Sequence, residues 1–506
     1  MPDLAMIRIL ESDEVIKMLS KRANEDGDIN LRESVNDILA QVRAGGDGAL
    51  CRLTERLDGC QLSPDSIKVT REEIDEARSM VDRDVMRAIR EAGENIRVYH
   101  EKQKINSWFQ CEREGVLLGQ LVTPLTRIGV YVPGGKASYP SSVLMNVIPA
   151  VVAGVKDIAM VTPPGKDGKI NIHTLAAAAE AGIKEIYRVG GAQAVAALAY
   201  GTETIKRVDK ITGPGNKYVT MAKRLVYGTV DIDMLAGPSE ILVVADSSAN
   251  PAFIAADLLS QAEHDEMAAA VLVTPDRALA LAVRDEVDRQ IKLLSRSGIA
   301  EKAVTDYGAI VITGNIEEAI DLANTIAPEH LELAVSDPFG WLGMIKAAGA
   351  VFLGHYSPEP VGDYVAGPNH VLPTGGTARF YSPLGVDQFV KKTSVISYNR
   401  KALEREASGI IKIAGVEGLD AHAESVEIRM RQNIQRPPAS AYDKGDEVSE
   451  GRFDIIQDIR DESIEKNSYG SLQDLSCLPA IPERRKDSGQ PQTKTMLSGE
   501  VKPENE

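Results

Sequence analysis

The sequence has no apolar stretch long enough to cross a lipid bilayer. Charged or polar residues interrupt every apolar run before it reaches the roughly 18 residues that a membrane helix requires. The opening residues, MPDLAMIRILESDEVIKML, are acidic and lack the basic, apolar and small-residue succession of a signal peptide. We therefore expect a cytoplasmic protein that has no membrane partner.

Cysteine is also scarce, and acidic residues outnumber basic ones. The chain has 4 cysteines among 506 residues, and Cys51, Cys60, Cys111 and Cys477 form no CxxC pair. They do not resemble the disulfide framework of a small secreted protein. The formal net charge is -17, which disfavours nucleic acid as a partner, because binding to phosphates depends on clustered Lys and Arg.

The remaining composition is that of an ordinary globular enzyme-sized chain. Hydrophobic residues make up 43% and charged residues 26% of the sequence, and the length allows several domains. Residues 1–110 show apolar residues at helical spacing. From about residue 126, short β-branched strands, Gly-rich turns and helices alternate, which predicts an α/β fold with parallel sheets. The alternation breaks near Leu235-Ala236-Gly237-Pro238, so we predict two successive sheets.

The last part of the chain consists of two segments of different composition. Residues 383–436 have a helical pattern, whereas residues 437–506 are polar, acidic and rich in proline. We expect this tail to be disordered or loosely attached. A short helix over residues 453–466 would also fit its pattern.

Three Gly-rich turns follow predicted strands and suit a bound phosphate. They are Pro133-Gly134-Gly135, Gly190-Gly191-Ala192-Gln193 and Gly213-Pro214-Gly215-Asn216-Lys217. Glycine lets the backbone approach an anion, and the next helix N-terminus offers free N–H groups. None completes GxGxxG, since Tyr218 replaces the last glycine of the third turn. Tight strand-to-helix connections need glycine too, so these turns alone leave both interpretations open.

Four residues offer ligands for a borderline divalent cation. Gln261 and His264 are three apart on a predicted helix and so share one face. Asp363 lies in a predicted loop after a strand, and His422 lies in a predicted C-terminal helix. Together they would form a site with two nitrogen and two oxygen donors. Their wide separation carries no specificity, and each would also fit as an ordinary surface or capping residue.

Glu329 and His330 follow Ala327-Pro328, in what we predict to be a proline-bent loop. The pair could act as a base and a water-activating carboxylate. A helix end with a structurally bonded histidine explains the same residues equally well.

Over roughly residues 30–430, the chain resembles the histidinol dehydrogenase family, and the matching stretches occur in the same order along the chain. The stretches that carry the resemblance are RIGVYVPGGKASYPSSVLMNVIPA, VGGAQAVAALAYGTETI, ITGPGNKYV, DMLAGPSEILVVAD, AADLLSQAEHD, APEHLEL, GHYSPEPVGDYVAGPNHVLPTGGTARF and EGLDAHAES.

The resemblance implies a role for each matching residue. Glu329 and His330 match the catalytic pair. The positions matching zinc ligands, with one zinc per subunit, are Gln261, His264, Asp363 and His422. Those matching substrate contacts are Ser239, His330 and Glu417, together with the four zinc ligands. Those matching NAD contacts are Tyr131, Gln193 and Asn216.

The resemblance also implies an activity and an assembly. The expected reaction is the oxidation of L-histidinol through L-histidinal to L-histidine with reduction of two NAD, and the expected assembly is a homodimer with shared active sites. The expected fold has two incomplete Rossmann-like domains. The segments we predict are a small helical segment over 1–25, a first Rossmann-like domain with a helical N-terminal part over 26–236, a second over 237–376, a C-terminal helical segment over 383–436 that docks on the partner chain, and the tail over 437–506.

Two other functions fit parts of this pattern. One is a related zinc- and NAD-dependent dehydrogenase of another polyol, such as a dihydroxypropanesulfonate. The loop Gly362-Asp363-Tyr364-Val365-Ala366-Gly367-Pro368-Asn369-His370 and the pair Glu417 and His422 favour histidinol over it. The other is a non-catalytic, zinc-stabilised scaffold, which the full set of catalytic positions opposes.

Overall fold

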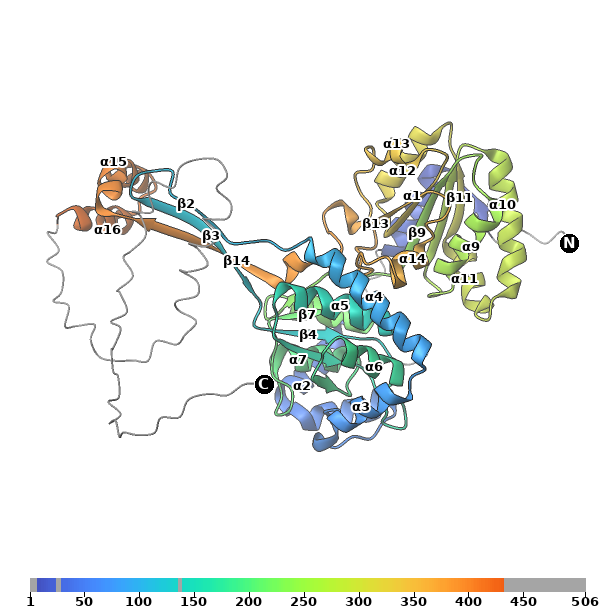
Figure 1. Ribbon diagram of the computed structural model, residues 1–506, viewed down its shortest axis with the longest axis horizontal. Coiled ribbons are helices and arrows are strands. Elements are labelled where there is room, and N and C mark those ends of the chain that lie inside the picture. Colours follow the sequence, from blue (N-terminus) through green and yellow to red (C-terminus); the bar gives the residue numbers. More distant parts are fainter. Residues whose placement is uncertain (1–6, 24–28, 135–138, 432–506) are drawn as a thin grey trace, which may run out of the picture. The chain divides into compact units, whose positions relative to one another are not determined.

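The computed structural model describes residues 7–23, 29–134 and 139–431 (Figure 1). The chain divides into two compact units. One is formed by residues up to 106 and residues 122–392, and the other by residues 107–121 and those from 393 onward. The tail over 437–506 and the short helix considered within it lie outside the described residues.

The first unit contains a five-stranded parallel sheet with the strand order β6-β5-β4-β7-β8. Its strands are β4 (Arg127–Tyr131), β5 (Asp157–Val161), β6 (Glu185–Tyr187), β7 (Lys210–Thr212) and β8 (Asp231–Ile232). The helices around it are α2 (Ile29–Asp58), α3 (Arg71–Met80), α4 (Arg83–Glu101), α5 (Pro140–Ala153), α6 (Ile172–Glu180), α7 (Gly191–Tyr200) and α8 (Lys217–Val226).

Helices cover both faces of this sheet. Apolar residues of α3, α4, α5 and α6 form one core cluster, and those of α2, α7 and α8 form the other. Every residue of β4 is buried, which explains why the strand reads as a continuous apolar run rather than an alternating one.

A second parallel sheet, also in the first unit, has the order β1-β11-β10-β9-β12-β13. Its strands are β1 (Arg8–Ile9), β9 (Glu240–Ala245), β10 (Ala269–Thr274), β11 (Gly308–Ile312), β12 (His330–Ala334) and β13 (Ala350–Leu353). Helices α9 (Pro251–Ala262), α10 (Arg277–Gln290) and α11 (Ser297–Tyr307) cover one face, whereas α1 (Ser12–Ala23), α12 (Ile316–Ile326) and α13 (Pro338–Leu342) cover the other (Figure 1). The predicted fold class, α/β with two parallel sheets, is confirmed.

Several local predictions were wrong. The N-terminal residues are not all helical, because β1 joins the edge of the second sheet beside β11, and β2 (Trp108–Gln110) is a strand. His330 does not lie in a loop but begins β12. Asp363 lies in the short helix α14 (Glu359–Tyr364), which Pro360 helps to start, and not in a loop. Helix α9 ends at Ala262, so His264 follows the helix.

The second unit combines a small sheet with two helices. Strands β2, β3 (Val116–Pro124) and β14 (Val390–Tyr398) form a sheet in the order β14-β3-β2. Helices α15 (Arg400–Val416) and α16 (Asp420–Arg431) follow. The segment over 383–436 is therefore not helical throughout, since β14 occupies nine of its residues. Only Val390, Val395 and Tyr398 of this strand are half-buried and its other residues are exposed, so it has no alternating pattern that would have marked it as a strand.

Side-chain caps explain where many helices begin. Asn216, Asn250, Asp276 and Asn399 each accept a hydrogen bond from a backbone N–H in the first turn of the helix that follows. Such caps satisfy N–H groups that have no partner within the helix. Within the described part of the chain, no helix is both long and apolar enough to span a membrane.

Candidate active site

The predicted cofactor residues lie at the carboxyl end of the first sheet. From β4 the chain adds β5 and β6 on one side and then crosses to β7 and β8 on the other, so the strand order reverses between β4 and β7. Open parallel sheets bind ligands at such a switch point. Tyr131 ends β4, Asn216 caps α8 after β7, and Gln193 lies in the first turn of α7 after β6.

At this switch point Tyr131 and Gln193 are buried and hydrogen-bonded to neighbours, whereas Asn216 is exposed. The Tyr131 hydroxyl accepts a hydrogen bond from the Gly191 N–H at 3.1 Å. The Gln193 Nε2 donates to Asp58 Oδ2 at 3.2 Å, whereas the buried Gln193 Oε1 has no hydrogen-bond partner among the residues that the structure describes. Burial raises the pKa of Asp58 to about 6. A buried acceptor without a partner is costly, so this end of the sheet suits a polar ligand that would supply a donor.

A buried ion pair holds the glycine-rich turn after β7. Asp233 Oδ2 accepts from the Gly213 N–H at 2.8 Å, and the Lys223 ammonium donates to the Gly213 carbonyl at 3.0 Å and to Asp233. Gly213 has φ of +116°, and a Cβ there would overlap the Tyr131 carbonyl oxygen. Only glycine fits this backbone approach.

A second group of predicted site residues lies at the amino end of the second sheet. Strands β9 and β12 pair in parallel with His330 opposite Ile241, which places Glu240 beside Glu329 and His330. The Glu240 N–H donates to Glu329 Oε2 at 2.8 Å. The Glu240 carbonyl accepts from His330 Nδ1 at 3.0 Å. One residue of β9 therefore holds both members of the predicted catalytic pair.

This bonding determines which nitrogen of His330 is free. A carbonyl can only accept, so Nδ1 carries the proton and Nε2 keeps its lone pair. The buried Nε2 has no hydrogen-bond partner among the described residues. Burial lowers the pKa of His330 to about 4, although Asp363 and the Glu240 carbonyl oppose this shift. The ring is then neutral at pH 7 and can accept a proton.

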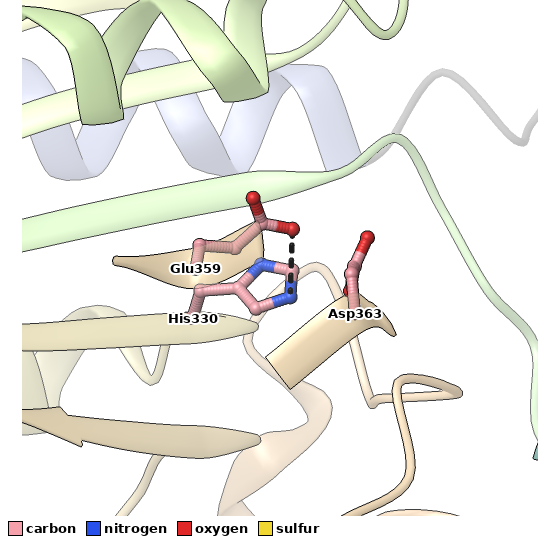
Figure 2. A group of neighbouring side chains, drawn as sticks. All are labelled: His330, Glu359 and Asp363. Atoms are coloured by element: carbon pink, nitrogen blue, oxygen red, sulfur yellow. Dashed lines mark ion pairs between the residues drawn. The ribbon is translucent and has the colours of Figure 1, made fainter. Parts of the chain in front are cut away.

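Two carboxylates lie beside this nitrogen. His330, Glu359 and Asp363 place one potential ligand atom each within 4.8 Å of one another (Figure 2). His330 Nε2 is 3.9 Å from Glu359 Oε1. Burial and the neighbouring Asp363 raise the pKa of Glu359 to about 9. Burial also raises the pKa of Glu329, to which the charges of Glu240, Asp363 and Glu359 add. Crowded carboxylates of this kind favour bound protons or a cation.

The other predicted metal ligands of the first unit lie near these groups. Gln261 Nε2 is 3.2 Å from His264 Nδ1, and within the described part of the chain the buried Gln261 Oε1 has no hydrogen-bond partner. His370 Nδ1 is 3.7 Å from Asp363 Oδ1. Burial lowers the pKa of His370, with Asp363 opposing and His264 adding to the shift. His264 and Asp363 act on the pKa of His330 as well, so these groups share one electrostatic environment.

Three further predicted substrate and metal residues, Ser239, Glu417 and His422, lie at other points of the fold. Ser239 is half-buried directly before β9, and its carbonyl accepts from Ala269 N at 3.0 Å. Glu417 is the C-cap of α15 and His422 lies in α16. Both belong to the second unit, whereas Gln261, His264 and Asp363 belong to the first.

Sequence reasoning did not single out Glu240, Glu359 or Asp58. Glu240 starts an apolar run directly after Gly237-Pro238-Ser239, and its contribution comes mainly from its backbone. Glu359 precedes a proline within a polar segment, and a buried acid gives no periodic signal. His370 was noted only as part of its loop.

Comparison with known proteins identifies the family. The family model described as histidinol dehydrogenase matches residues 20–430. The chain belongs to the histidinol dehydrogenase family. It is 56% identical over 429 residues to a histidinol dehydrogenase of Heliobacterium mobile, covering 84% of this chain and all (100%) of that protein. It is 57% identical over 412 residues to that of Bacillus subtilis, covering 81% and 96%.

A solved structure of the same family agrees with the fold. The crystal structure of histidinol dehydrogenase from Elizabethkingia anophelis superposes with a TM-score of 0.80 at 39% sequence identity. The match covers 84% of this chain and 98% of that one. Family membership also removes the grounds for the alternative polyol dehydrogenase and the non-catalytic scaffold.

The turn at Gly213 generates a prediction for this histidinol dehydrogenase family member. Gly213→Ala should weaken NADH binding by at least roughly tenfold, since the strained turn would shift away from Tyr131 and the predicted cofactor positions. The fluorescence of bound NADH measures this affinity. Gly228→Ala is the matched control, because Gly228 also has positive φ (+95°), but beyond its chain neighbours no atom of the described residues lies within 4 Å of an added Cβ. Equal affinities for the two variants would contradict the prediction.

Proposed function

We propose that this protein oxidises L-histidinol through L-histidinal to L-histidine, the closing steps of histidine biosynthesis, with NAD as the acceptor. The observation that carries the proposal is the neutral, buried His330, whose Nδ1 is bound to Glu240 and whose Nε2 is free beside Glu359. The few cysteines suit a reducing compartment, so we place the enzyme in the cytoplasm.

We propose that Gln261, His264, Asp363 and His422 hold a zinc ion. The buried Gln261 Oε1 has no hydrogen-bond partner among the described residues, which supports a ligand bound to this oxygen. Imidazole nitrogens and carbonyl or carboxylate oxygens suit zinc. His330, Glu359 and Asp363 are an alternative set of ligands. The first set is favoured because it leaves His330 Nε2 available as a base.

In the first oxidation, His330 would accept the hydroxyl proton of histidinol at Nε2. When bound, zinc would orient the substrate's imidazole and amino nitrogens and NAD would accept one hydride in each oxidation. Glu240 keeps the proton of the neutral His330 ring at Nδ1, so the lone pair is at Nε2. The resulting imidazolium would be stabilised by the charge of the nearby Asp363.

In the second oxidation, a water molecule must add to the aldehyde. Glu329 would remove a proton from this water, and its raised pKa makes its carboxylate a stronger base than an exposed one. The hydrated aldehyde then loses a proton to His330 and a hydride to give the carboxylic acid. Keeping both steps at one buried site protects the reactive aldehyde from solvent.

The first sheet provides the support for a dinucleotide site. Tyr131, Gln193 and Asn216 come from three different strand-to-helix connections at one end of that sheet. The unpartnered Gln193 Oε1 could accept from a ribose or amide group. The Gly213 turn leaves the backbone bare beside Tyr131.

The second unit supports a homodimer with shared active sites. Its helices bury few apolar residues, namely Ala402, Ala407, Ala414 and Val426. Ile413 and Val416, in contrast, are 64% and 90% exposed. A unit with so small a core needs another surface for stability. We propose that it docks on a second copy and contributes His422 and Glu417 to that copy's site, with Glu417 accepting from the substrate ammonium.

An absorbance assay at 340 nm with histidinol and NAD tests the proposed function directly. Removal of the metal should abolish NADH production, and zinc should restore it. Manganese or cobalt should restore activity in part, because nitrogen and oxygen ligands discriminate weakly among divalent ions. Full activity in protein shown to be metal-free would refute the metal assignment, and no activity in zinc-loaded protein would refute the function.

Single-turnover assays separate the roles of the catalytic pair. His330→Asn should slow both oxidations by roughly 10²–10⁴-fold, the usual effect of losing a general base. Glu329→Gln should slow mainly the reaction that starts from histidinal, because only that step consumes water. The amide oxygen of the new glutamine can still accept the hydrogen bond from the Glu240 N–H, so this substitution removes the acid without removing that contact. Equal losses with histidinol and histidinal would contradict the division of roles.

Mixed dimers test whether the site is shared. His264→Ala and His422→Ala chains should each be inactive, because each removes a zinc ligand. After dissociation and reassociation, half of the dimers would be mixed, and each mixed dimer would have one intact site if His422 serves the partner. About a quarter of all sites should then recover. Activity that stays near zero would show that each chain supplies all four ligands itself.

A further inference from the structure

A buried arginine at the end of the first helix contacts the segment that holds the catalytic pair. Arg22 lies in the last turn of α1 and is 4% exposed. Its Nε donates to the Met267 carbonyl at 2.6 Å, and its Nη1 donates to Glu240 Oε1 at 2.8 Å. Its Nη2 donates to the carbonyls of Pro238 and Ser239.

These contacts cover every residue of the segment 238–240. The carboxylate of Glu240 also accepts from Gly375 N at 3.1 Å, so its side chain is anchored from two directions. The backbone N–H and carbonyl of the same residue bind Glu329 and His330. Arg22 is therefore separated from both catalytic side chains by a single residue, although it touches neither in the described contacts.

From these contacts we propose that Arg22 is a positioning residue for the catalytic pair, an inference that rests on the proposed roles of Glu329 and His330. Its planar guanidinium satisfies four acceptors in fixed directions, which an ammonium group cannot do. It thereby fixes the peptide that sets the Nδ1–H tautomer of His330 and the direction of its free Nε2. The Met267 contact extends the same brace to the connection between His264 and β10.

A role confined to folding would give a different result from a positioning role. If Arg22 only stabilises the unit, its loss lowers the melting temperature and leaves the folded enzyme fully active. If it positions the pair, the folded enzyme loses kcat while substrate and cofactor still bind. A misplacement of about 1 Å can lower the rate by roughly 100-fold.

The test compares Arg22→Lys with Arg127→Lys. Arg127 is also buried, pairs with Asp157 and Glu185, and lies at the amino end of β4, away from the predicted cofactor residues. Below the melting temperature of both proteins, Arg22→Lys should lower kcat by roughly 10- to 100-fold for histidinol and for histidinal. KM and NADH affinity should change by less than about threefold, and Arg127→Lys should keep kcat within about twofold of the parent.

A second measurement covers the case in which Arg22→Lys folds poorly. Guanidinium ion added to Arg22→Ala should restore part of the lost kcat, and it should not restore activity to His330→Asn. The inference is overturned if folded Arg22→Lys has a kcat within about twofold of the parent, or if guanidinium restores nothing to folded Arg22→Ala. Parent enzyme that does not oxidise histidinol would instead refute the proposed function itself.

Discussion

The pairing of β9 with β12 is the constraint on which the site depends. It places the peptide groups of Glu240 beside Glu329 and His330, so that one backbone N–H and one carbonyl bind both side chains. Backbone groups within a sheet cannot rotate away, unlike the side chains that orient histidines in many other sites. The consequence is a neutral imidazole with a defined tautomer, buried where water does not compete for its lone pair.

The two sheets of the first unit divide the chemistry between them. The predicted cofactor residues follow the usual rule, at the carboxyl end of a switch point. The proposed catalytic pair does not, because it lies at the amino ends of β9 and β12. At the carboxyl end of these strands, the hollow lined by Asn250, Asp257 and His355 has a volume of about 10 Å³, enough for roughly one water molecule. In this proposal the second sheet provides the catalytic groups and the first provides the cofactor site.

Strand position could be predicted from sequence where apolar runs are continuous, as in β4, β9, β10 and β11. It could not be predicted for β12, because HLELA contains a histidine and a glutamate. Both are buried because specific hydrogen-bond partners satisfy them. Glu332 accepts from the Glu359 N–H at 2.8 Å, and His330 donates to the Glu240 carbonyl. Partners distant in sequence decide such cases, and periodicity carries no information about them. The same reason explains the short helix α14 at Asp363.

The candidate residues show the same limit. Spacing alone predicted that Gln261 and His264 lie close together, and in the structure Gln261 Nε2 is 3.2 Å from His264 Nδ1. It could not connect either with Asp363, and only family resemblance linked them to His422. The braces formed by Arg22, and by Lys223 with Asp233, gave no sequence signal, since a buried charge is recognised only through its partner.

The catalytic role proposed for His330 requires a neutral ring with its proton on Nδ1. Nitrogen NMR of protein labelled with ¹⁵N at the histidine rings measures this tautomer directly. Seven histidines contribute, and the signals that disappear in His330→Asn assign the ring. At pH 7 we expect a neutral ring with the proton on Nδ1 and the chemical shift of an unprotonated nitrogen at Nε2. A charged ring, or a proton on Nε2, would contradict the account, because His330 could not then accept the hydroxyl proton.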